Sequence, residues 1–138
     1  MNQAELTEFA NRYAAAWSSR NPASLAAFYM EDGSLTVNSG APSVGRAAIT
    51  TTAQGFMTAF PDMVVKLKDV SQGGSLTIFR WIWTGTNTGP GGTGKQVRIE
   101  GYEEWTFGAN GLIATSKGHY DEVEYARQLQ VGARATGL

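Results

Sequence analysis

The hydrophobic pattern changes its period near Asp62, and this change constrains the fold more than any other feature of the sequence. Before that point, apolar residues recur at helical spacing, as on one face of an amphipathic helix. After it, apolar and polar residues alternate, as in strands that bury one side. Helices followed by a run of strands predict an α+β protein with an antiparallel sheet.

Three helices are expected in the first part of the chain. The first places its large apolar side chains, including Tyr13 and Trp17, on one face. The second opens with an asparagine cap followed by a first-turn proline, and the third ends where another proline follows it. Their expected ranges are 3–18, 22 to about 32 and 46–60, with a short strand at 34–37 before the third.

Four strands are expected after Asp62, because the segments there are rich in β-branched and aromatic residues and are separated by glycine-containing turns. The glycine-rich loop at 89–94 lacks the strand-loop-helix context of a phosphate-binding loop, so it is interpreted as a long hairpin connection. The expected strands are 64–70, 75–86, 96–107 and 112–120.

Composition limits the possible classes of function. The 138 residues suit a single domain, 1–138, with a flexible tail at 131–138. A net charge of −1 argues against nucleic-acid or membrane partners. With no cysteine and a single histidine, we expect no disulfide and no metal site. The amino terminus has no signal-peptide pattern, so a cytoplasmic location is expected.

Glu103 stands out because it lies on the otherwise apolar side of its strand, next to Trp105. Partial burial of a carboxyl group raises its pKa and prepares it for proton transfer, although a salt bridge is the alternative explanation. A three-residue turn ending at Gly111 would place Glu103 opposite Lys117, with His119 and Asp121 on the same side of the sheet. A slip of one residue would send His119 and Asp121 to the other side.

Several segments resemble a known family: Trp81 to Gly89 (WIWTGTNTG), the loop from Gly91 to Lys95, and the final GHYDEVEYARQL. Together with the order of elements, they resemble SnoaL-like polyketide cyclases within the nuclear transport factor 2-like and ketosteroid isomerase superfamily. The resemblance spans nearly the whole chain and implies a cone-shaped, curved antiparallel sheet closed by three N-terminal helices. It also implies a homodimer or higher homo-oligomer, paired through the outer face of the sheet.

The resemblance implies roles for individual residues. Asp121 stands where these cyclases have their acid/base aspartate, with His119 as a possible partner, and Glu103 stands where relatives have an inner histidine or an oxyanion-stabilising aspartic acid. Tyr13 resembles an oxyanion-donating tyrosine. Asn38 falls near the base aspartate of the isomerases and cannot accept that proton. The implied substrate contacts are Tyr13, Trp17, Asn38, Phe56, Trp81, Trp83, Asn87 and Trp105.

Two classes of function remain open. The first is a cofactor-independent acid/base enzyme that acts on a hydrophobic carbonyl compound, such as a polycyclic ketone, in an enclosed pocket. The second is a noncatalytic small-molecule-binding or dimerisation module with the same fold. Structural roles are also open: Tyr13 and Trp17 suit a core, and Asp121 suits the cap of a final helix. An epoxide-hydrolase function is the weaker alternative, because the Asp-Arg-Asp set that it needs is not evident.

Overall fold

The computed structural model describes residues 1–133, which form one six-stranded sheet and four helices. The predicted tail is only partly covered by these residues: Val131 ends the last helix, and the Ala133 N–H donates to the Gln96 carbonyl oxygen at 2.7 Å. Residues 134–138 lie outside the described part. The elements are α1 Gln3–Trp17, α2 Pro22–Ala26, β1 Tyr29–Val37, β2 Ser43–Val44, α3 Arg46–Ala59, β3 Val64–Gly73, β4 Leu76–Thr86, β5 Gln96–Phe107, β6 Ile113–His119 and α4 Glu122–Val131.

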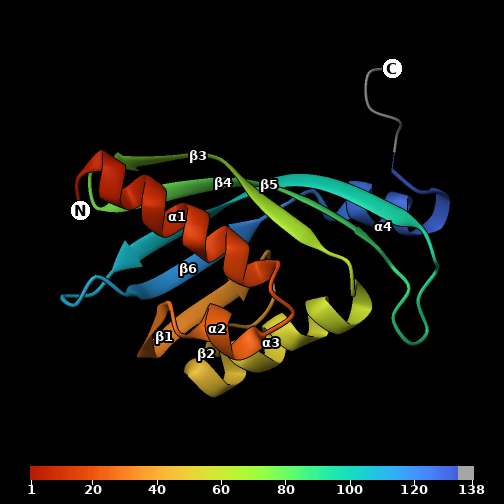
Figure 1. Cartoon of the computed structure of the whole chain (residues 1–138), viewed down its shortest axis with the longest axis horizontal. Coiled ribbons are helices and arrows are strands. Elements are labelled where there is room, and N and C mark those ends of the chain that lie inside the picture. The colour runs from red at the N-terminus through yellow and green to blue at the C-terminus, as the bar shows by residue number, and fades with distance from the viewer. Residues whose placement is uncertain (134–138) are drawn as a thin grey trace.

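The sheet has the order β2-β1-β6-β5-β4-β3 and is curved (Figure 1). Strands β3 to β6 form an antiparallel meander, whereas β1 pairs with β6 in parallel. Helix α1 lies along the sheet against β3, α2 and α3 pack together beside β1, and α4 contacts β5. This architecture confirms the predicted α+β fold with three N-terminal helices.

Local sequence signals begin three of the helices. Asn2 and Glu5 form a capping box at the start of α1, and Asn21 caps α2 ahead of its first-turn proline. Asp121 caps α4. Helix α2 is shorter than predicted, because the chain enters β1 at Tyr29 and Asp32-Gly33 lies within that strand instead of ending a helix.

The core lies between α1 and the inner face of the sheet. On β5, Val97, Ile99, Glu103 and Trp105 are buried, and the residues between them are more exposed, as the alternation predicted. Trp105 stacks on Phe79 of β4 with ring centroids 4.8 Å apart. The predicted inner face of β5 is therefore confirmed, and Glu103 is on it.

The predicted register between β5 and β6 is wrong by one residue. The turn itself is as expected: Gly111 has a φ of 75°, and the Gly108 N–H donates to the Leu112 carbonyl oxygen at 2.8 Å. Phe107 pairs with Ile113, but the next pair is Thr106 with Thr115, so Ala114 is an extra residue. This bulge places Glu103 opposite Gly118 instead of Lys117.

Candidate functional site

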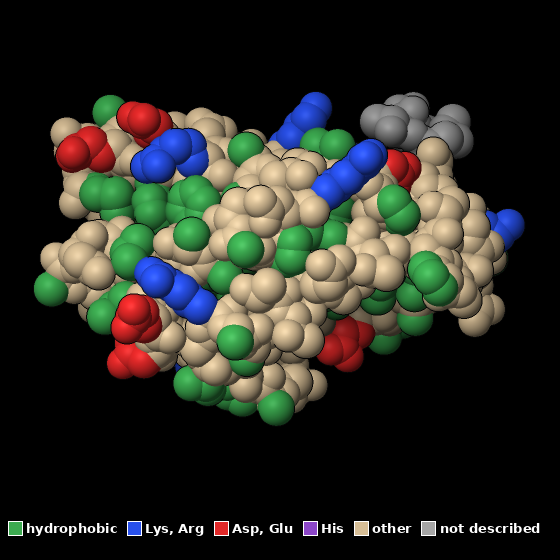
Figure 2. Space-filling model, turned by 60° about the horizontal axis from the view of Figure 1, so that its bottom comes forward, with side chains coloured by type: hydrophobic (Ala, Val, Ile, Leu, Met, Phe, Trp, Pro, Cys, Tyr) green, Lys and Arg blue, Asp and Glu red, His purple; other side chains and the backbone are tan. Residues whose placement is uncertain are grey.

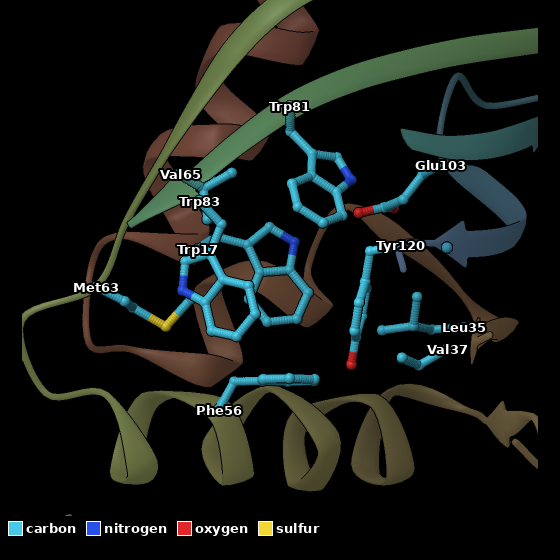
Figure 3. A pocket seen from close by; sticks show the side chains of 11 residues that line it. Trp17, Leu35, Val37, Phe56, Met63, Val65, Trp81, Trp83, Glu103 and Tyr120 are labelled. Carbon is cyan, nitrogen blue, oxygen red and sulfur yellow. The ribbon is translucent and has the colours of Figure 1, made fainter. Parts of the chain in front are cut away.

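A small cavity lies between α1, α3 and the inner face of the sheet. Its free space is about 60 Å³, and it is partly open to the surface. Among the described residues its lining is almost entirely apolar and aromatic, with Glu103 as the only Asp or Glu (Figure 3). The lining residues are Trp17, Leu35, Val37, Phe56, Met63, Val65, Trp81, Trp83, Glu103, Gly118 and Tyr120.

Glu103 is 6% exposed, and its two carboxyl oxygens have different surroundings. Oε1 accepts hydrogen bonds from the Tyr13 hydroxyl at 2.8 Å, the Trp105 indole N–H at 2.9 Å and the Ser116 hydroxyl at 2.6 Å. The hydroxyl groups of Tyr13 and Tyr29 lie 2.7 Å apart, so Tyr29 extends this network. Within the described part of the chain, no hydrogen bond is made to Oε2.

Burial raises the pKa of the Glu103 carboxyl, and the hydrogen bonds from Ser116, Trp105 and Tyr13 oppose that rise. Burial, followed by the nearby charge of Glu103, raises the pKa of the Tyr13 hydroxyl well above 10.0, so this group remains a donor. Because three donors already surround Oε1, the proton of the neutral acid belongs on Oε2. A carboxyl group held in this way gains and loses its proton at one defined atom.

Aromatic rings form the walls of the cavity at steep angles to one another. Phe56 meets Trp83 at 88° and Trp17 at 80°, and Tyr120 meets Trp81 at 66° and Trp83 at 67°. The buried indole N–H groups of the three tryptophans have no hydrogen-bond partner among the described residues. In Figure 3 the Trp81 nitrogen is on the side of its ring that faces the Glu103 carboxyl.

Asp121 and His119 lie outside this cavity. The prediction that they lie on the same side of the sheet as Glu103 is wrong. The bulge at Ala114 turns His119 to the outer face, where its Nε2 lies 2.6 Å from Glu104 Oε1 and its ring stacks on Tyr102. Asp121 is exposed, and its Oδ1 accepts from the backbone N–H groups at positions 123 and 124, at 2.9 and 3.0 Å. The capping role weighed for Asp121 is the one observed.

The two predicted asparagines hold loops. Asn38 Oδ1 accepts from the Tyr120 backbone N–H at 2.9 Å, which fixes the chain just beyond β6. Asn87 bridges α3 and the glycine-rich loop, because its side chain donates to the Ala59 carbonyl oxygen and accepts from the Thr93 N–H. Neither residue lines the cavity.

Five predicted residues do line the cavity: Trp17, Phe56, Trp81, Trp83 and Glu103. Tyr13 and Trp105 instead lie behind Glu103 and donate to it. Sequence reasoning did not assign a role to Tyr120, although it belongs to the GHYDEVEYARQL segment. Sequence reasoning also missed Gly118, because its position opposite Glu103 follows only from the register that the bulge sets. The glycine leaves room beside the Glu103 side chain.

Other kinds of site find no support in the described part of the chain. No group of three or more His, Asp or Glu residues there is arranged to hold a metal ion, and no helix is long and apolar enough to cross a membrane. Figure 2 shows acidic and basic side chains interspersed over one face of the molecule, without a continuous field of one sign. This distribution agrees with the net charge of −1.

The curved sheet and its covering helices form the α+β fold of ketosteroid isomerase-like and nuclear transport factor 2-like proteins. A sequence model of the SnoaL-like domain matches residues 10–116. The chain belongs to the SnoaL-like domain family. A search of curated proteins gives no match.

Solved structures agree on the fold. A protein from Catenulispora acidiphila with a ketosteroid isomerase-like fold, in complex with trimethylamine, has a TM-score of 0.77 at 18% identity, covering 88% of this chain and 91% of that one. A candidate polyketide cyclase from Xanthomonas campestris pv. campestris has a TM-score of 0.76 at 21% identity, covering 94% and 100%. The epoxide hydrolase/cyclase-like enzyme SalBIII has a TM-score of 0.75 at 15% identity, covering 89% and 95%.

Proposed function

We propose that this chain is a cofactor-independent acid/base enzyme that moves a proton on a small hydrophobic carbonyl compound, with Glu103 as the proton-transferring group. The observation that carries the proposal is the asymmetry of the Glu103 carboxyl group. Three donors hold Oε1, whereas Oε2 has no hydrogen bond among the described residues and belongs to a side chain that lines the cavity. A buried carboxyl with a raised pKa suits proton transfer near neutral pH.

The proposed reaction needs only this one carboxyl group to change its protonation state. Ionised Glu103 removes a proton from the carbon next to the substrate carbonyl, and the electron pair of that C–H bond moves onto the carbonyl oxygen as an enolate. The proton, now on Oε2, then returns to the same carbon, where the enolate C=C electron pair forms the new C–H bond and the carbonyl group is restored. With an enone as substrate the enolate is conjugated, and the proton can instead be added at the far carbon of the dienolate, which moves the double bond. The indole N–H of Trp81, which lines the same cavity and has no hydrogen-bond partner among the described residues, is the proposed donor to the enolate oxygen.

The size of the cavity favours a small substrate over the polycyclic ketone expected from the resemblance. A free space of about 60 Å³ suits a compound with a handful of non-hydrogen atoms, and a polycyclic ketone would have to extend out of the open side of the cavity. The trimethylamine complex of the Catenulispora acidiphila protein supports a ligand of this size. We therefore propose a short-chain carbonyl compound as the substrate.

A noncatalytic small-molecule-binding module is the second candidate. It is favoured by the positions of Asp121 and His119, which leave Glu103 as the only carboxyl group that the described residues place on the cavity wall. A binder would use Glu103 as a fixed hydrogen-bonding or charged contact. The catalytic roles of Asp121 and His119 stay predictions, and their positions lend them no support.

Exchange of substrate protons with deuterated water, followed by NMR, separates these functions. A panel of short ketones and enones is incubated with the natural protein, with Glu103→Gln, and with Glu104→Gln as a matched control on the outer face. We expect exchange to fall by about 100-fold or more in Glu103→Gln and to persist in the control. If no compound that binds exchanges faster than in buffer, the module is a binder. If Asp121→Asn abolishes exchange while Glu103→Gln retains it, the proton-transferring group is Asp121.

A further inference from the structure

We propose that the cavity takes an alkylammonium group, so that its ligand is a small organic cation held by aromatic rings and by the Glu103 carboxylate. This inference rests on the proposed function only in placing the ligand in the same cavity, and it does not require turnover. It specifies that the ligand carries a positive charge, whereas the proposed reaction leaves the charge of the substrate open.

The first argument is charge. Glu103 is buried, and its three hydrogen-bond donors are all neutral groups. No Lys, Arg or His occurs among the described residues that line the cavity. A buried carboxylate requires a partner of opposite charge or must take up a proton. A cationic ligand would supply the countercharge that the described part of the protein does not provide there.

The second argument is the arrangement of the rings. Cations bind the faces of aromatic rings, and ammonium-binding sites commonly enclose the cation with several rings set at steep angles. Here Phe56, Trp83 and Tyr120 meet in this way, at 88° for the first pair and 67° for the second. Figure 3 shows the Phe56 ring lying flat below the cavity and the Tyr120 ring edge-on at its side, so that each turns a face to the space between.

The third argument is size combined with position. The free space of about 60 Å³ is that of a site for a small group, and a trimethylammonium group has only four non-hydrogen atoms. Glu103 and Gly118 face each other across neighbouring strands at one wall. Phe56 and Tyr120 are only half-buried, so the aromatic side is the more accessible one. A ligand can therefore place its cationic head near Glu103 and extend its remaining atoms past these rings.

The two proposals are compatible. An ammonium group next to a C–H bond acidifies that bond, because it stabilises the negative charge that develops on the carbon. A small carbonyl compound that carries an alkylammonium substituent would therefore combine both features, with the carboxylate acting as its countercharge and as its base. Binding of the cation alone tests the inference without any reaction.

Fluorescence of the cavity tryptophans can measure this binding with two probes of matched shape. Choline carries a trimethylammonium group, and 3,3-dimethylbutan-1-ol carries a neutral tert-butyl group in its place. We expect the natural protein to bind choline at least tenfold more tightly than the neutral alcohol. Glu103→Gln should weaken choline binding at least tenfold and change alcohol binding less than twofold, whereas Glu104→Gln should change neither.

A second variant tests the aromatic wall independently of the carboxyl group. Phe56→Leu keeps an apolar side chain of similar volume but removes the ring face, so it should weaken choline binding severalfold more than alcohol binding. The inference is overturned if the natural protein binds the alcohol as well as it binds choline, or binds neither probe. Loss of this preference with Glu103-dependent proton exchange intact removes only the cation proposal. Choline binding without exchange on any carbonyl compound removes only the enzymatic one.

Discussion

Replacing Glu103 with glutamine should make the protein relatively more stable as the pH rises. The amide oxygen of glutamine can take the place of Oε1 and accept the same three hydrogen bonds, while its NH₂ group takes the place of Oε2. The variant is therefore a permanent mimic of the neutral acid. Any cost of the unpartnered NH₂ group is independent of pH.

The sign follows from the raised pKa of Glu103 in the folded protein. Below its ordinary value of 4.5 the carboxyl group is protonated in both the folded and the unfolded chain. As the pH rises, the unfolded chain loses this proton first, so folding increasingly requires proton uptake. The stability contributed by the neutral acid is present below 4.5 and is lost as the pH rises through the folded pKa. Each pH unit inside this window changes the free energy of unfolding by up to about 1.4 kcal/mol relative to Glu103→Gln.

Urea unfolding at half-unit steps from acidic to mildly alkaline pH measures the effect. The quantity to plot is the free energy of unfolding of the natural protein minus that of Glu103→Gln, because other titrating groups cancel in this difference. Glu104→Gln is the control: it removes a carboxyl group that lies on the outer face beside His119. We expect a fall that begins near pH 4.5 and levels off above the folded pKa of Glu103.

Two results would refute this reasoning. A difference that stays constant with pH would mean that folding leaves the pKa of Glu103 unchanged. A difference that grows with pH would mean that the donors from Tyr13, Trp105 and Ser116 outweigh burial and hold Glu103 ionised. In that second case the carboxylate would be too weak a base near neutral pH for the reaction proposed above.

Two further predictions concern residues that support the cavity. Asp121→Ala should cost about 1 kcal/mol of stability, because it removes the cap that accepts two backbone N–H groups of α4; urea unfolding checks this, and an unchanged midpoint would contradict the capping role. Gly101→Ala should lower the free energy of unfolding by about 1–3 kcal/mol or more, because the added Cβ would lie 2.5 Å from both the His119 carbonyl oxygen and the Trp81 ring. Displacement of the Trp81 ring should also shift the tryptophan fluorescence. Gly55→Ala is the matched control: its Cβ meets nothing within 4 Å in α3, so this change should be stabilising by about 0.5–1 kcal/mol, and equal losses in both glycine variants would contradict the crowding argument.

Periodicity and turn chemistry were sufficient to predict most of the fold. The change of period near Asp62 separates the helical part from the meander, and the alternation on β5 placed Glu103 on the buried face. The Gly111 turn also formed as expected. These features depend on short-range preferences, which the sequence shows directly.

The site was harder to predict because it depends on one unpaired residue. No glycine, proline or asparagine marks the position of the bulge at Ala114. The bulge nevertheless shifts every later residue pair between β6 and β5 by one position. With the shift, Gly118 replaces Lys117 opposite Glu103, and His119 moves to the outer face. A lysine opposite Glu103 would have given it a cationic partner, so the same bulge that defeated the register prediction also leaves this carboxyl group without a countercharge from the strand beside it.

This absence of a cationic partner links the stability and the function of the molecule. A lysine or arginine beside Glu103 would lower the pKa of the carboxyl group and satisfy its charge within the protein, but it would also leave a weaker base and a cavity that repels cations. The observed arrangement instead uses neutral donors from Tyr13, Trp105 and Ser116 to fix Oε1, and no described residue donates to Oε2. If Glu103→Gln proves more stable at neutral pH and also loses both exchange and choline binding, the destabilising charge is the functional group itself. That combination is expected where a site trades stability for reactivity.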